Sequence, residues 1–161
     1  MNTTSRILGE AMTPYQKRIY KNPAKAYRWA LNNSQLFPEA EPYIATDPKS
    51  AIMYLLHVRG SKGGRWPEAE PYILTNASSA FSYASGFIRG RWIEAEPIIA
   101  TDPLCACLYA SQVLNHRWPE VEQAIAADKT ATTCYLNKFP EARVDWLIHG
   151  LSTDWLGRCV V

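Results

Sequence analysis

The 161-residue sequence predicts an all-α protein, a right-handed α-solenoid of about five stacked antiparallel helix pairs with atypical terminal repeats. Three observations support this fold class. A nine-residue motif recurs at a nearly fixed spacing, a second series of helix-capping residues runs between its copies, and apolar residues follow both at helical intervals. One helix pair cannot bury its own apolar face, so the repeats are expected to stack along the chain.

The repeated motif reads Arg-Trp-Pro-Glu-Ala-Glu-Pro-Tyr-Ile over residues 65–73. Copies begin 26 residues apart at Arg91 and Arg117, an earlier copy begins 29 residues upstream at Leu36, and a shortened copy begins at Lys138. Repeats of this length are the signature of stacked helical units. We therefore expect one domain over 1–161, with repeats at about 12–36, 37–65, 66–91, 92–117 and 118–138 and a capping segment at 139–161.

The first helix of each repeat starts in the motif, where aromatic, small and isoleucine positions recur three and seven residues apart. Pro42, Pro71 and Pro97 lie inside this stretch, where proline removes a backbone hydrogen bond. The helix is therefore either kinked or begins as a 3₁₀ turn that becomes α near the proline. The expected ranges, after an N-terminal helix near 13–21, are 38–45, 67–74, 93–100, 119–127 and 140–149.

The second helix of each repeat follows an Asn or Asp whose side chain can accept hydrogen bonds from the first turn. These predicted caps are Asn22, Asp47, Asn76, Asp102 and Asp128. Apolar or small residues lie 4, 7, 8 and 11 positions after them, which marks one face of a helix. The expected ranges are 23–33, 48–59, 77–89, 103–115 and 129–138, and Thr153 with Asp154 is expected to cap a last short turn.

The motif, followed by Thr-Asp-Pro, Ala and Tyr-Ala at these intervals, resembles short helical repeats of about 26 residues in uncharacterised proteins of tailed bacteriophages and large DNA viruses. The resemblance covers roughly residues 12–146. It implies an α-helical repeat array and supplies no activity or site. Gln123 in place of the inner proline and Arg143 in place of the second glutamate make the last units look like capping units. A phage origin would favour an accessory role against a host factor.

Composition indicates which partners and which compartment to expect. A net charge of +2 is too small to attract nucleic acid or an anionic membrane by overall charge. No secretory signal is expected at the start and no apolar run approaches the roughly 18 residues of a membrane span. Four cysteines without paired spacing are typical of free thiols in a reducing compartment. We expect a cytoplasmic protein, in the host cell if viral, with no membrane partner.

The residues that invite a chemical role mostly recur with the repeat. The paired glutamates, the arginines Arg65, Arg91 and Arg117, and the Trp and Tyr columns are therefore expected to serve structure, the arginines by pairing with glutamates of a neighbouring unit. The histidines and cysteines lack metal-ligand spacing, and no nucleophile elbow, phosphate loop or dinucleotide fingerprint is present. We predict no metal, no cofactor and no catalytic residue, and hence no enzyme.

Residues that break the repeat are the better site candidates. Several apolar residues of the second helices lie off the core face, where either helix packing covers them or they form an exposed patch. A basic insert at 59–65 interrupts the period beside them. The predicted partner-binding residues are Ile52, Met53, Leu56, Phe81, Leu108, Arg59, Lys62 and Arg65.

The leading hypothesis is a non-catalytic protein-binding module, with a host protein as partner if the origin is viral. A second hypothesis is a nucleic-acid-binding repeat protein that uses an Arg and Lys edge, for which affinity would fall steeply with salt. A third hypothesis is an enzyme with a site that no motif reveals. A fourth is a structural homo-oligomer that associates through the same apolar residues.

Overall fold

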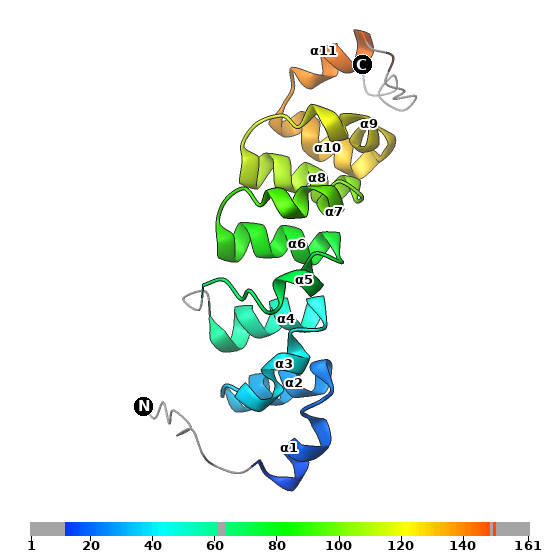
Figure 1. Ribbon diagram of the computed structural model, residues 1–161. Coiled ribbons are helices and arrows are strands. Elements are labelled where there is room, and N and C mark those ends of the chain that lie inside the picture. Colours follow the sequence, from blue (N-terminus) through cyan, green and yellow to red (C-terminus); the bar gives the residue numbers. More distant parts are fainter. Residues whose placement is uncertain (1–11, 61–63, 149, 151–161) are drawn as a thin grey trace. The chain divides into compact units, whose positions relative to one another are not determined.

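The computed structural model describes residues 12–60, 64–148 and 150, and every regular element in these ranges is a helix (Figure 1). The all-α fold class is therefore confirmed. The chain divides into two compact units, residues 1–79 and 80–161, which are described separately below. None of the described helices is long and apolar enough to cross a membrane. The predicted cap at Thr153 and Asp154 lies outside the described residues.

The first unit consists of short helices that alternate between the two kinds expected. Helix α4 packs against α2, α3 and α5, and α2 also packs against α1 and α3. The elements are α1 (Pro14–Ile19), α2 (Pro23–Asn33), η1 (Pro38–Ala40), α3 (Glu41–Ile44), α4 (Pro48–Tyr54), η2 (Leu55–Arg59) and α5 (Glu70–Ile73), and α6 (Ala77–Tyr83) begins here and ends in the second unit.

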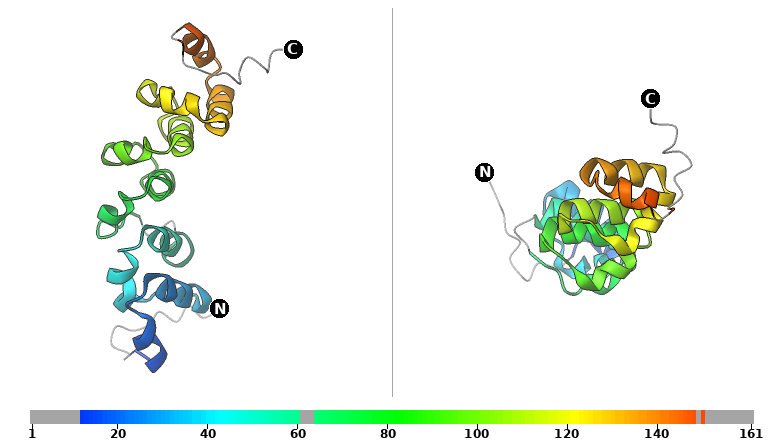
Figure 2. Two further views of the ribbon diagram at one scale, coloured as in Figure 1. Left: turned by 90° about the vertical axis from the view of Figure 1, so that its right-hand side faces the viewer. Right: turned by 90° about the horizontal axis from the view of Figure 1, so that it is seen from above.

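The second unit repeats this alternation and ends in longer helices. Helix α8 packs against α7, α9 and α10, and α9 packs against α10 (Figures 1 and 2). The elements are η4 (Ala84–Ile88), η5 (Ile93–Ala95), α7 (Glu96–Ile99), α8 (Pro103–Tyr109), η6 (Ala110–Leu114), α9 (Pro119–Ala127), α10 (Lys129–Lys138) and α11 (Ala142–Ile148).

The predicted helix caps are confirmed by their hydrogen bonds. In each case the cap oxygen accepts from the backbone N–H three residues later, at distances between 2.7 and 3.0 Å. A cap of this kind contributes about 1 kcal/mol to the free energy of unfolding. The caps explain why the second helices begin where the sequence predicts, at Pro23, Pro48, Ala77, Pro103 and Lys129.

Proline position decides the shape of the first helices. The structure supports a 3₁₀ start, since η1 precedes α3 and η5 precedes α7, with Pro42 and Pro97 in the first α-helical turn. There the missing N–H has no intrahelical partner to lose. In the copy where Gln123 replaces this proline, α9 runs unbroken over Pro119–Ala127. Helices α5 and α11 begin later than predicted, at Glu70 and Ala142.

The ends of three second helices differ from the expected continuous α-helix. Segments η2, η4 and η6 are π-helical, with hydrogen bonds reaching one residue further than in an α-helix. Each is followed by a residue with positive φ, namely Gly60, Arg89 and Asn115. Helices α2 and α10 lack a π-helical segment, although α2 is also followed by a residue with positive φ, Ser34.

Most positions of the predicted core columns are buried, the exceptions including Val58 and Val113, which are partly buried. The small residues four positions after each cap are fully buried, as are Tyr54, Tyr83, Tyr109 and Tyr135 three positions further on. The motif contributes Phe37, Trp66 and Trp92 together with buried alanine and isoleucine positions. Trp29 and Trp118 are only partly buried. The small residues let neighbouring helices approach closely, and the aromatic rings fill the space beside them.

Candidate functional site

A buried tyrosine connects the two helices of a repeat through a recurring polar contact. The backbone N–H of the motif aromatic donates to the tyrosine hydroxyl, which in turn donates to the second glutamate of the motif. Phe37 N lies 2.9 Å from Tyr54 Oη, and Tyr54 Oη lies 3.0 Å from Glu41 Oε1. The same chain of contacts links Trp92, Tyr109 and Glu96, and also Trp118, Tyr135 and Glu122. The second glutamates, here called the inner glutamates, are Glu41, Glu70, Glu96 and Glu122.

In the three motif copies that begin with arginine, this arginine donates hydrogen bonds to the inner glutamate. Arg65 Nε and Nη2 donate to Glu70 at 2.8 and 2.7 Å, and Arg91 holds Glu96 in the same two-pronged way at 2.6 and 3.0 Å. Arg117 grips Glu122 with two bonds of 2.7 Å. The expected arginine–glutamate pairing is therefore present. Each glutamate lies five residues after its arginine, in the same nine-residue motif and, by the repeat bounds expected above, in the following repeat. Two parallel charge-assisted bonds fix both the position and the orientation of the guanidinium.

The Glu122 contact is the most buried of the three. Its carboxylate also accepts from Tyr135 Oη at 2.8 Å and from Trp146 Nε1 at 2.7 Å, while Arg117 makes a second ion pair with Asp145. Burial alone would raise the pKa of Glu122. Hydrogen bonds from Arg117, Trp146 and Tyr135 outweigh it and leave this pKa below its ordinary value. The group is therefore an ionised anchor of the second unit.

The second repeat lacks the motif arginine. Leu36 stands at the arginine position, five residues before Glu41, and its side chain is 47% exposed. Glu41 keeps its hydrogen bond from Tyr54 but makes no ion pair with any described residue. Burial beside this carboxylate raises the pKa of Tyr54, so the hydroxyl keeps its proton. Glu41 is consequently a half-buried carboxylate with one acceptor side unused.

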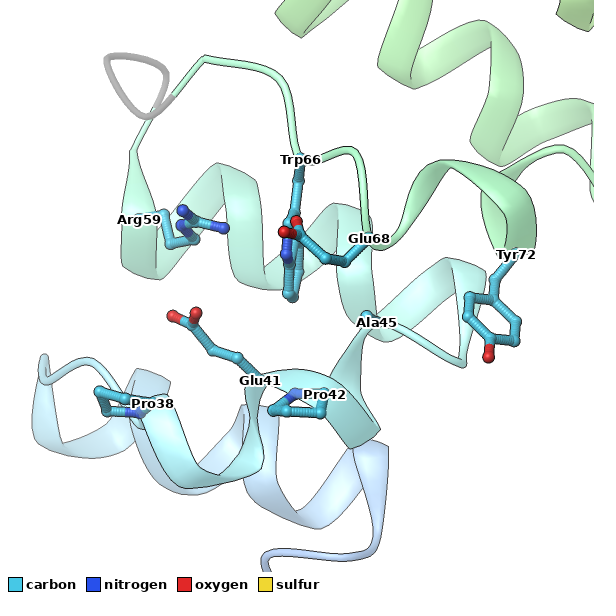
Figure 3. Close-up of a pocket in the computed structure, with 8 residues that line it drawn as sticks. All are labelled: Pro38, Glu41, Pro42, Ala45, Arg59, Trp66, Glu68 and Tyr72. Carbon is cyan, nitrogen blue, oxygen red and sulfur yellow. The ribbon is translucent and has the colours of Figure 1, made fainter.

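A pocket of about 410 Å³ lies in the first unit at this carboxylate (Figure 3). The Glu41 carboxylate points from α3 toward Arg59 and Trp66, and Glu68 also lines the pocket (Figure 3). Arg59 at the end of η2 places its guanidinium 5.0 Å from the centre of the Trp66 ring and makes no ion pair with any described residue. The lining residues are Pro38, Glu41, Pro42, Ala45, Arg59, Trp66, Glu68 and Tyr72.

The chemical character of the pocket follows from its wall. Two carboxylates and one guanidinium leave it net negative, and Tyr72 and two prolines supply apolar surface beside the largely buried ring of Trp66. Such a combination suits a cation with an apolar stem, because the charge meets a carboxylate while the stem packs on the rings. The described residues that line the pocket include no Ser, Thr, Cys, Lys or His that could act as a nucleophile.

The predicted partner-binding residues differ in how far they are exposed in the structure. Met53 and Leu56 are exposed, whereas Ile52 is only 7% exposed and belongs to the core. Ile52 is thus removed from the candidate surface, because contacts within the helix packing cover it. Phe81 and Leu108 are half-buried in helices α6 and α8 of the second unit.

The predicted residues of the basic insert at 59–65 also differ in their surroundings. Arg59 lines the pocket, whereas Arg65 is exposed but bound to Glu70. Lys62 lies outside the described residues. Glu41, Trp66, Glu68 and Tyr72 were not predicted as site residues. One feature of the sequence could have indicated them. Among the four motif copies that keep the inner glutamate, the copy that begins at Leu36 is the one whose first residue is not basic.

Other chemistry-bearing side chains do not gather elsewhere in the described part of the chain. In residues 12–60, 64–148 and 150, no three or more His, Cys, Asp or Glu side chains are grouped so that they could hold a metal ion. Burial, with a smaller contribution from Asp102, raises the pKa of Cys105 to about 12, and burial beside Cys134 raises that of Cys107. These thiols stay protonated at neutral pH and are poor nucleophiles.

Comparisons with family models, with curated proteins and with solved structures find no match to this chain. The resemblance to phage and viral helical repeats stays a prediction.

Proposed function

We propose that the chain is a non-catalytic protein-binding module whose helix pairs stack as a right-handed α-solenoid and whose first unit carries the binding surface. The observation that carries this proposal is a set of exposed apolar side chains on three helical segments that pack against one another. Leu31 on α2 is 37% exposed, Met53 on α4 is 41% exposed and Leu56 on η2 is 46% exposed.

These three residues occupy related positions. Leu31 and Leu56 each lie nine residues after the cap of their helix, and Met53 lies one turn before Leu56. The positions of the second unit that correspond to Leu31 and Leu56 are Ser85, Ser111 and Asn137, and those that correspond to Met53 are Ser82, Leu108 and Cys134. Exposed apolar side chains on neighbouring helical segments are candidates for a surface that binds another protein. We call Leu31, Met53 and Leu56 the apolar patch.

The pocket at Glu41 supplies a polar element close in sequence to the apolar patch, because η2 carries both Leu56 and Arg59. Protein interfaces commonly combine apolar contacts with a few directed charge-assisted bonds. The combination in one unit favours a protein ligand over a small metabolite.

The nucleic-acid hypothesis is weakened by the arginines on which it depends. Arg65 and Arg91 are more than half exposed, yet each is neutralised by two bonds to a glutamate of its own motif. A phosphate would have to displace the glutamate or bind an arginine that is already paired. Because each arginine has one glutamate beside it, the positive charge that attracts phosphate is neutralised.

The test is an affinity capture from bacterial lysate at high salt, since the phage-like repeat favours a bacterial partner. Wild type is compared with Met53→Asp/Leu56→Asp and with the control Ile93→Asp/Leu104→Asp, which charges exposed apolar residues of the second unit. We expect one protein to be retained by wild type and control and lost by the first variant. Circular dichroism of all three proteins checks that they fold.

Retention by all three proteins would contradict the proposed surface. Recovery of nucleic acid at low salt only would replace the proposal with the nucleic-acid hypothesis. Self-association of wild type in sedimentation, abolished by Met53→Asp/Leu56→Asp, would assign the apolar patch to a homo-oligomer instead.

A further inference from the structure

We propose that the Glu41 pocket is a receptor for a guanidinium group, namely an arginine side chain presented by the protein partner. This inference rests on the proposed function for the identity of the partner. The chemistry of the pocket itself is argued from this chain alone.

The chain provides its own template for the bound state. At the other three inner glutamates, an arginine five residues earlier lays its guanidinium along the carboxylate with two bonds of 2.6 to 3.0 Å. Glu41 has the same sequence neighbours and the same tyrosine contact, with Tyr54 in the place of Tyr109 and Tyr135. Only the guanidinium is missing, because Leu36 replaces the arginine.

An open volume adjoins Glu41. The pocket of about 410 Å³ adjoins the unused side of the carboxylate and is large enough for one extended side chain. Pro38 and Pro42 flank Glu41 along the wall, and the exposed ring of Tyr72 supplies surface for the methylene stem of an incoming residue. Glu68 adds a second carboxylate, so the site attracts a cation despite Arg59.

A guanidinium fits better than an ammonium for a geometric reason. The planar fork of arginine donates two parallel bonds to one carboxylate, whereas lysine donates as a point charge. Trp66 already accepts the guanidinium of Arg59 near its ring, at 5.0 Å from the ring centre. Stacking of this kind is a general preference of arginine over lysine.

The direct test is an NMR titration of the full chain with N-acetyl-arginine amide, followed at the Trp66 indole N–H. N-acetyl-citrulline amide, which has the same shape without the charge, and N-acetyl-lysine amide are the ligand controls. We expect saturable shifts at Trp66 with the arginine compound, at least fivefold weaker binding of the lysine compound and no shift with citrulline. Equal shifts with all three compounds would overturn the proposal.

Three variants identify the carboxylate. Glu41→Gln keeps the shape and removes the charge, so arginine binding should fall at least tenfold. Glu39→Gln is the matched control, because Glu39 is the exposed first glutamate of the same motif. Leu36→Arg restores the motif and should abolish binding by filling the site from within. Unchanged binding in both Glu41→Gln and Leu36→Arg would overturn the assignment.

Arg59 offers the one internal competitor among the residues that line the pocket wall. If Arg59 served as the counter-ion of Glu41, free arginine would bind only to the Arg59→Ala variant and not to wild type, which would contradict the proposal. We expect wild type to bind, with at most a severalfold gain in Arg59→Ala from removal of one positive charge.

The two proposals fail in different ways. If arginine binds at Trp66 but no protein is captured, the pocket assignment holds and the protein-binding function is wrong. If a captured protein is lost by Met53→Asp/Leu56→Asp but kept by both Glu41→Gln and Leu36→Arg, the function holds and the arginine contact with the partner is wrong.

Discussion

Glu41 in the first unit and Glu122 in the second occupy the same motif position in contrasting surroundings. Glu122 receives hydrogen bonds from an arginine, a tyrosine and a tryptophan and is 5% exposed. Glu41 receives one from Tyr54 and faces a pocket. The same residue thus anchors the structure in one repeat and is available to a ligand in another. Two residues make the difference: Leu36 stands at the arginine position before Glu41, and Trp146 donates to Glu122 alone.

The comparison carries a general lesson about repeats. A polar residue that recurs with the period serves the structure as long as its partner recurs with it. When the partner is lost in one copy, the remaining residue keeps its position but not its charge balance. Such a copy is the place to look for binding in an array with no catalytic motif.

Removing the buried anchor should produce the largest effect. Glu122→Ala leaves the Arg117 guanidinium, the Tyr135 hydroxyl and the Trp146 indole N–H without their acceptor, and should cost about 3–5 kcal/mol in the free energy of unfolding. Glu41→Ala removes one hydrogen bond from a half-buried site and should cost about 1 kcal/mol. Urea unfolding followed by circular dichroism measures both. Equal losses would show that the two sites do not differ as described.

Acid should destabilise the protein through Glu122. Its pKa is lowered on folding, so its contribution to stability is complete above the ordinary carboxyl value of 4.5 and is lost as the pH falls through the lower folded value. Glu122→Gln removes this titration. We expect the wild-type urea midpoint to fall more steeply than that of the variant between roughly pH 5 and pH 3, the range just around and below the ordinary pKa. Parallel curves would contradict the assignment.

The tyrosine hydroxyls offer a finer comparison. Tyr135→Phe strands the Trp118 N–H and takes a donor from a buried, charged carboxylate, which should cost about 2–3 kcal/mol. Tyr54→Phe strands the Phe37 N–H but touches the less buried Glu41, and should cost about 1–2 kcal/mol. Thermal unfolding of both variants beside wild type tests the order. A larger loss for Tyr54→Phe would reverse the comparison.

The first glutamates of the motif should show the smallest effect. Glu39 and Glu94 are exposed and make no hydrogen bond or ion pair with a described residue. Glu39→Gln and Glu94→Gln should therefore change the free energy of unfolding by no more than ~0.5 kcal/mol. A loss comparable to that of Glu41→Ala in either variant would mean that the two glutamates of a motif are not distinct in role.

Much of the fold was predictable because local chemistry determines it. Asx caps with a following proline set where the second helices begin, and the prolines at positions 42 and 97 set the 3₁₀ to α change. The π-helical ends of η2, η4 and η6 were not predicted, and nothing in the sequence pattern distinguishes them from a continuous α-helix. The burial of Ile52 was likewise a matter of helix packing that periodicity alone left open.

The site was harder to predict than the fold because a missing residue creates it. The sequence indicated that arginines and glutamates pair, but not that each arginine pairs within its own motif, five residues away. Without that distance, Leu36 had no evident connection to Glu41. Three-dimensional contacts in the intact copies were needed to show what the second repeat lacks.

The most direct test of the central claim is a double-mutant cycle between Leu36→Arg and Glu41→Gln, measured by urea unfolding. The claim is that Glu41 retains the arginine-binding geometry of the other repeats. Leu36→Arg should then stabilise the wild-type background by about 0.2–1 kcal/mol, as expected for a partly exposed pair, and give no gain in the Glu41→Gln background. An equal effect of Leu36→Arg in both backgrounds would contradict the account.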